Sequence, residues 1–188
     1  MCPTTRTIAL RVAGGRARGF TMVELLAVVT MVGILAAVAI VGYRRYLNAA
    51  HSGEAKNVVG AIRVAESSYK AETLGYLGCS ATLAAYYPAA PDGKKRNFNN
   101  PGHPDSACWQ LLNVSTDTPT LYGFSVVAGS PGAAPPVPDT ALKPTWPAPT
   151  TEPWYVIQAA GDIDANGAYS YFLSSSFSGE IYDEEPTE

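Results

Sequence analysis

Hydrophobic residues are distributed very unevenly along this chain. From Phe20 to Gly42, a run of 23 residues contains one charged side chain, Glu24. An α-helix of that length rises roughly 35 Å, which exceeds the hydrocarbon core of a bilayer at about 30 Å. The run therefore predicts a membrane-spanning helix. Because a carboxylate in hydrocarbon is costly, Glu24 is expected to have a partner.

The pattern becomes amphipathic in the next segment, residues 43–76. Val58, Ile62, Ala65 and Tyr69 recur at helical spacing and predict one apolar stripe. The charged residues of this segment are assigned to its solvated faces: Glu54, Lys56, Arg63, Glu66, Lys70 and Glu72. We expect one long helix from about residue 21 to about residue 73, ended by the glycines at 75 and 78.

The remaining residues, 77–188, predict a small β-sheet head. Residues 79–130 are rich in turn signals, with one alternating strand pattern at 121–129. Residues 131–153 hold eight prolines and predict an exposed, extended loop. Strand patterns follow at 154–160 and 169–174, and a short last strand precedes an acidic tail. The expected fold is α+β: a long N-terminal helix spine packed on an antiparallel sheet of three or four strands.

Charge divides the chain at the start of the apolar run. The first 19 residues carry four arginines and no acid, so the net charge of −3 is +4 on this short head and −7 on the rest. The positive-inside tendency keeps the head cytoplasmic and exports the C-terminal part. The apolar run is about twice as long as that of a secretory signal peptide and lacks a small-residue cleavage pattern after it.

The stretch "GFTMVELLAVVTMVGILAAVAIVGY" resembles the N-terminal signature of type IV pilins and the related pseudopilins. The likeness continues more weakly through residues 52–72. It implies that prepilin peptidase removes residues 1–19 by cleavage after Gly19, and that Phe20 becomes the N-methylated first residue. It also implies that residues 20–42 form the transmembrane or filament-core helix.

This resemblance gives Glu24 a partner. In a stack of such helices, its carboxylate can face the α-amino group of Phe20 on a neighbouring subunit and so set the register, since each buried charge alone would be far costlier than the pair. The alternative is a glutamate that snorkels to the membrane edge. Many pilins have a proline late in the apolar run, whereas this chain has Val41 and Gly42 there, so local helix melting in a fibre is less expected.

Two further groups of residues have competing interpretations. Cys79 and Cys108 are the cysteines left after leader removal, and in an exported domain we expect them to form a disulfide, the alternative being two free thiols. Asp162, Asp164 and Asn166 reproduce half of a calcium-loop pattern, and major pseudopilins bind calcium near their C-terminal end. The glutamate that would complete the pattern is absent, so a tight turn is favoured over a calcium cofactor.

The other polar and aromatic groups give no sign of catalysis. Lys94, Lys95 and Arg96, with Phe98 nearby, could contact DNA or an acidic neighbour, but three adjacent cations in a loop favour a solvated tip, and nucleic-acid binding is not expected. The three tryptophans are expected to be packing residues or loop anchors. The sequence has no Gly-rich phosphate loop, no Cys-x-x-Cys and no His-Glu-x-x-His motif, so neither an enzyme nor a cofactor is expected.

The function expected from the resemblance is a structural subunit, major or minor, of a type IV pilus. Its partners would be other pilin subunits, the prepilin peptidase and methyltransferase, and the assembly platform with its ATPase. It would be a single-pass protein of the cytoplasmic membrane and later part of a surface fibre. A type II secretion pseudopilin is the first alternative, and a membrane-anchored binding domain that does not polymerise is the second.

Overall fold

The computed structural model describes residues 19–138, 140–142 and 144–184. The chain separates into two units, residues 1–46 and 47–188. The elements are helices α1 (Met22–Thr73) and α2 (Ser106–Leu112) and strands β1 (Tyr122–Gly129), β2 (Trp154–Gly161), β3 (Ser170–Ser175) and β4 (Ser178–Glu184). The predicted leader lies outside the described residues except for Gly19.

Helix α1 confirms the expected long helix, but it ends differently. Its last residue is Thr73, and Leu74 then takes the left-handed conformation at φ 64° while its amide donates to the carbonyl of Lys70. The predicted terminators, the glycines at 75 and 78, lie beyond this turn. A leucine thus occupies the position that glycine usually fills at a helix end.

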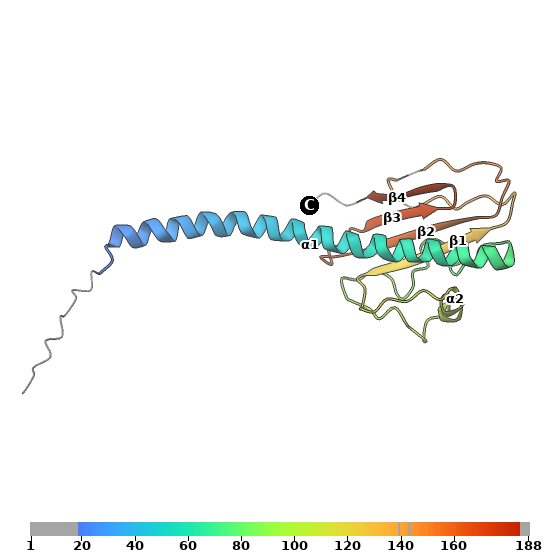
Figure 1. The fold of residues 1–188 in the computed structure, drawn as a ribbon, viewed down its shortest axis with the longest axis horizontal. Helices are drawn as coiled ribbons and strands as arrows, with labels where there is room; N and C mark the ends of the chain where they lie inside the picture. The colour runs from blue at the N-terminus through green and yellow to red at the C-terminus, as the bar shows by residue number, and fades with distance from the viewer. Residues whose placement is uncertain (1–18, 139, 143, 185–188) are drawn as a thin grey trace, which may run out of the picture. The chain divides into compact units, whose positions relative to one another are not determined.

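The second half of α1 packs on the sheet through one face (Figure 1). Val58 and Ile62 are buried as predicted, whereas Ala65 and Tyr69 are only partly buried. The prediction for Glu66 was wrong, because this side chain is fully buried rather than solvated. It lies four residues after Ile62 and therefore continues the buried face of the helix.

The four strands form an antiparallel meander in the order β1-β2-β3-β4 (Figure 1). In the register, Val126 lies opposite Ile157 on β2, and Ala159 lies opposite Phe172 on β3. Side chains alternate between the two faces of the sheet, so each face has its own hydrophobic cluster. The strand predictions and the α+β fold class are confirmed.

The face of the sheet toward α1 carries the main core. It is formed by Val59 and Ile62 of the helix, residues of the first three strands such as Phe124, Ile157 and Phe172, and the aromatic group Tyr87, Phe98 and Trp109. Phe98 is 3% exposed, so it belongs to this core and not to a contact patch with the nearby cations.

The opposite face is covered by a second, smaller cluster. Leu83, Trp154, Val156 and Leu173 are buried there, with Trp146 and Phe177 packed against them. The proline-rich segment 131–153 contains no helix or strand among its described residues, as predicted, but it is not simply exposed. The indole nitrogen of Trp146 donates to the carbonyl of Pro136 at 3.1 Å, so the loop is folded back on itself over this face.

One element was missed by the sequence analysis. Residues 106–112 form helix α2 inside the segment predicted as turns, with Trp109 and Leu112 buried. The preceding prolines and glycines obscured a helix of only seven residues.

Candidate functional site

The predicted cleavage site lies just before the helix. Gly19 and Phe20 precede α1, and the side chain of Phe20 is 84% exposed. Among the described residues, a Cβ atom placed on Gly19 would have no neighbour within 4 Å beyond the adjoining residues. Within this part of the chain, neither packing nor helical hydrogen bonds therefore protect the bond between Gly19 and Phe20.

Glu24 and Thr21 form a capping box at the start of α1. One carboxylate oxygen of Glu24, Oε2, accepts hydrogen bonds from the backbone amide and the hydroxyl of Thr21, both at 2.9 Å. The Thr21 hydroxyl in turn accepts from the Glu24 amide at 3.2 Å. These bonds satisfy helix-terminal donors and hold the carboxylate at the start of the helix. Sequence reasoning identified Glu24 but missed Thr21, although the pattern Thr-x-x-Glu was readable.

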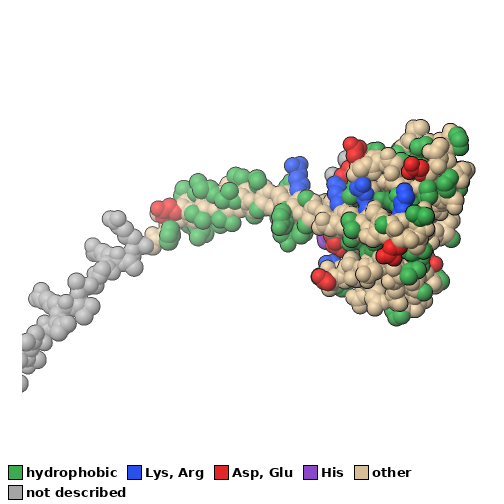
Figure 2. Space-filling model, turned by 45° about the vertical axis from the view of Figure 1, so that its right-hand side comes forward, with side chains coloured by type: hydrophobic (Ala, Val, Ile, Leu, Met, Phe, Trp, Pro, Cys, Tyr) green, Lys and Arg blue, Asp and Glu red, His purple; other side chains and the backbone are tan. Residues whose placement is uncertain are grey.

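The helix that follows has an uncovered apolar surface. All described side chains from Phe20 to Gly42 are exposed, and α1 contains a window long and apolar enough to cross a membrane. Figure 2 shows these hydrophobic side chains along the helix, with acidic atoms at one end and basic ones beyond the other. Such a surface requires a lipid or protein environment, because so large an apolar area is rarely left in water.

Cys79 and Cys108 form the predicted disulfide, with their Cα atoms 5.4 Å apart. The bond joins the chain just after α1 to helix α2. Trp109, the neighbour of Cys108, is 1% exposed and stacks on Tyr87. The disulfide therefore fixes α2 against the main core.

The weak calcium candidate forms a hydrogen-bonded turn. The carboxylate of Asp162 accepts from the amides of Asn166 and Gly167, and that of Asp164 accepts from the amide and side chain of Asn166. Within the described residues, no group of three or more acidic, histidine or cysteine side chains is placed to hold a metal. The three residues do come together, but their oxygens accept hydrogen bonds from backbone amides and from the Asn166 side chain, as in an Asx turn.

The basic loop is partly neutralised by its own sequence. Arg96 forms an ion pair with Asp92, and its backbone pairs with Thr120, while Lys94 and Lys95 are exposed. The Arg96 guanidinium lowers the pKa of Asp92 below its usual value. This arrangement is that of an ordinary solvated loop.

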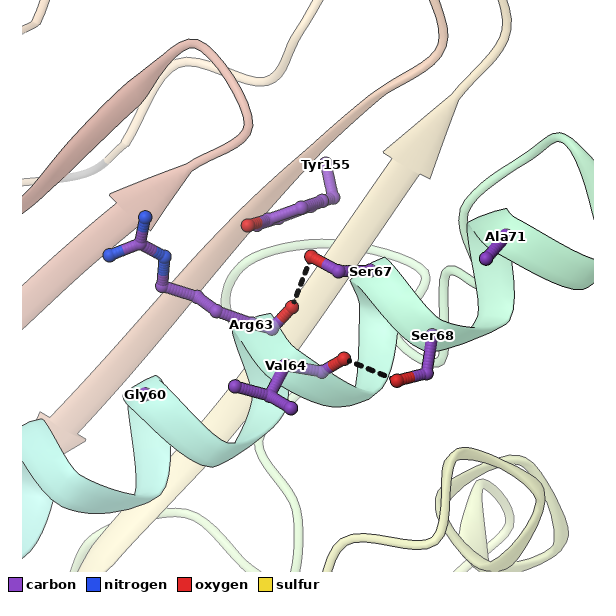
Figure 3. A pocket seen from close by; sticks show the side chains of 7 residues that line it. All are labelled: Gly60, Arg63, Val64, Ser67, Ser68, Ala71 and Tyr155. Atoms are coloured by element: carbon purple, nitrogen blue, oxygen red, sulfur yellow. Dashed lines mark hydrogen bonds between the residues drawn. The ribbon is translucent and has the colours of Figure 1, made fainter.

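A groove of about 550 Å³ follows the outer face of α1 beside the sheet (Figure 3). Tyr155 of β2 and the side chain of Arg63 lie along it, and the hydroxyls of Ser67 and Ser68 donate to carbonyls of their own helix. Desolvation raises the pKa of the Tyr155 hydroxyl. The hydroxyls of both serines are turned to the backbone, so the groove contains no nucleophile paired with a base.

Glu66 is a carboxylic acid of the head whose side chain is fully buried. Its Oε2 accepts from the amide of Leu77 at 2.8 Å, which ties the end of α1 to the segment leading to Cys79. Its Oε1 is buried and has no hydrogen-bond partner among the residues that the structure describes. Burial raises the pKa of this carboxyl from 4.5 to about 7, and the Leu77 amide opposes this change only in part.

Comparison with protein-family models points to the same N-terminal segment. Residues 15–40 match the family model described as the prokaryotic N-terminal methylation motif. Over 52 residues, the chain is 40% identical to fimbrial protein EcpC of Eikenella corrodens, and this alignment covers 28% of the present chain. The aligned segment spans 34% of that relative's length. No solved structure matches. The chain thus carries the type IV pilin signature at its N-terminus.

Proposed function

We propose that this protein is a structural subunit of a type IV pilus. The observation that carries the proposal is the methylation motif at residues 15–40, located at the start of a helix whose apolar surface nothing in the described chain covers. The subunit is stored in the cytoplasmic membrane through residues 20–42 and cleaved after Gly19. It is methylated at Phe20 and then packed into a fibre by the assembly platform and its ATPase.

Glu24 acts in assembly by pairing with the α-amino group of Phe20 on a neighbouring subunit. The capping box supports this role, because Thr21 engages one oxygen of Glu24, Oε2, and holds the carboxylate at the helix start. The same oxygen keeps its local bonds while the other is available to a neighbour. A carboxylate so oriented loses less conformational entropy when the second charge arrives.

A type II secretion pseudopilin has the same N-terminal signature and is the main alternative. A calcium site at residues 162–166 and unpaired cysteines would favour it. The Cys79–Cys108 disulfide and the Asx turn at residues 162–167 favour the pilus subunit instead. The non-polymerising alternative predicts that residues 1–19 remain attached and that Glu24 is dispensable.

Mass spectrometry of the protein from membranes and from sheared surface fibres tests processing. We expect a mature N-terminus at methylated Phe20, and we expect Gly19→Leu to retain the leader. A Cβ atom at residue 19 meets no described residue within 4 Å beyond its chain neighbours, so loss of cleavage in this variant would report on the peptidase and not on folding. An unprocessed wild-type protein in both fractions would contradict the proposal.

Glu24→Gln separates the two roles of this side chain. Glutamine at the same position can still accept the bonds from Thr21, but it carries no charge. We expect Glu24→Gln to be cleaved and methylated, yet absent from sheared fibres, as for Glu24→Ala. If Glu24→Gln assembled normally while Glu24→Ala did not, capping and not charge pairing would be the function of this residue.

A further inference from the structure

The apolar part of α1 ends in a ring of four residues that we call the interfacial collar: Tyr43, Arg44, Arg45 and Tyr46. All four are exposed, the two tyrosines by 63% and 70%. Since an α-helix has about 3.6 residues per turn, four consecutive side chains point outward in directions that surround the helix. A ring of this kind suits an environment that is the same on every side, such as the surface of a membrane.

The two arginines of the collar have no partner in the described part of the chain. Neither makes a hydrogen bond or an ion pair there, in contrast to Lys56, whose ammonium lies 2.6 Å from the Asp183 carboxylate. The nearest acidic residues in the sequence are Glu24 before them and Glu54 after them. The guanidinium groups of the two arginines can therefore bind an anion from outside the chain, and the planar fork of N–H donors matches the geometry of a phosphate.

The distance along the helix matches a bilayer. Arg44 follows Glu24 by twenty residues, which at about 1.5 Å per residue is roughly 30 Å, the thickness of the hydrocarbon core. When the arginines lie at one interface, Glu24 reaches the other and its carboxylate avoids hydrocarbon. Tyrosine is enriched at such interfaces because its ring is apolar and its hydroxyl is polar.

The orientation of the helix makes the collar unusual. The arginines before Phe20 place the collar on the exported side, where the positive-inside tendency disfavours Arg and Lys. Cleavage after Gly19 removes all four of those arginines and leaves the collar arginines as the basic side chains next to the span. Anionic lipid headgroups attract such cations, and a guanidinium can bind a phosphate through two parallel hydrogen bonds.

We propose that the interfacial collar binds the phosphate groups of anionic phospholipids in the exported leaflet and thereby fixes the depth of the helix. This inference rests on the membrane storage of residues 20–42 proposed above. It gives the subunit a lipid-binding site that is separate from the Glu24 contact. The lipid phosphates must be released when the helix leaves the bilayer.

Lipid-specific quenching in vesicles tests the collar. The processed full-length chain with Val41→Cys has one thiol outside the Cys79–Cys108 disulfide, and this thiol carries a fluorophore near the collar. Phosphatidylcholine vesicles contain a small, fixed share of either brominated phosphatidylglycerol or brominated phosphatidylcholine. We expect the anionic quencher to be about twofold or more effective, because each arginine near the surface attracts anionic lipid.

Two double variants complete the design. Arg44→Gln with Arg45→Gln should bring the ratio of the two quenching efficiencies to one. Lys94→Gln with Lys95→Gln removes the same charge from an exposed loop of the head and should leave the wild-type ratio unchanged. A ratio of one in the wild type, or a wild-type ratio in the variant that lacks both arginines, would contradict the proposal that the collar binds anionic lipid. Absence of quenching by either lipid would instead contradict the membrane storage on which the inference rests.

Discussion

The buried carboxyl of Glu66 makes the stability of the head depend on pH. Its side chain is fully buried, and its pKa rises from 4.5 to about 7. Below pH 4.5 the group is protonated in both the folded and the unfolded state and has no effect on stability. Between pH 4.5 and 7 the unfolded chain releases the proton while the folded chain retains it, so this group lowers the free energy of unfolding as pH rises.

The size of the effect follows from the two pKa values. At about 1.4 kcal/mol per pH unit, a rise from 4.5 to about 7 corresponds to roughly 3 kcal/mol of lost stability above pH 7. Glu66→Gln keeps an acceptor for the Leu77 amide and has no proton to lose. We therefore expect the free energy of unfolding of the variant, minus that of the wild type, to increase by about 2–3 kcal/mol between pH 4 and pH 8.

Urea unfolding of the full-length chain in a non-ionic detergent, at pH values from 4 to 8, measures this difference. All three tryptophans lie in residues 47–188, so their fluorescence reports on the head. Glu72→Gln is the matched control, since Glu72 is on the same helix but exposed. Its difference from the wild type should not change with pH. A pH-independent difference for Glu66→Gln would refute the assignment of a raised pKa to Glu66.

Two further predictions concern the covalent and aromatic anchors of the head. Cys79→Ser with Cys108→Ser should lower the free energy of unfolding by about 3–4 kcal/mol in urea titrations, because the loop closed by the disulfide becomes free in the unfolded chain; Cys2→Ser should have no effect. Trp146→Ala should lower the free energy of unfolding by about 1–3 kcal/mol and speed proteolysis within residues 131–153, because Trp146 packs on Phe177 and donates a hydrogen bond to the carbonyl of Pro136. Val137→Ala is the control, since Val137 lies in the same loop and is 76% exposed, and it should have neither effect. Equal cleavage rates in these two variants would mean that Trp146 does not anchor the loop.

The parts of the fold that were readable from the sequence are those with a simple period or a strict chemical requirement. The apolar run after Phe20 requires a helix, because only regular secondary structure satisfies backbone groups in an apolar environment. Strands β1 and β2 are buried on both faces of the sheet for most of their length, so they read as short apolar runs bounded by turn residues. Two cysteines in an exported domain have few alternatives to pairing. These inferences needed no knowledge of which strands are neighbours.

Two wrong predictions, for Glu66 and for the proline-rich segment, share a cause: the type of residue was given more weight than its position in the pattern. Glu66 was assigned to solvent because it is charged, although its spacing from Val59 and Ile62 places it on the buried face. The proline-rich segment was read as exposed because proline disrupts regular structure, although Trp146 within it had to be covered. In both cases the contacts that decide burial come from segments far away in the sequence, Leu77 for Glu66 and Phe177 for Trp146.

Helix α1 obtains its stability from different sources along its length. Residues after 46 bury one face against the sheet, whereas the side chains of residues 20–42 have no cover within the described chain. On the proposed function, this apolar half moves from lipid to the core of a fibre, and its hydrophobic burial is similar in both. Among the side chains of residues 20–42, the one whose surroundings change most is then the carboxylate of Glu24. Its bonds to Thr21 are internal to the helix and persist in both states. The free-energy difference that drives docking therefore depends on whether its second oxygen pairs with the α-amino group of a neighbouring subunit. For this reason the charge of Glu24, and not its capping bonds, is expected to decide assembly.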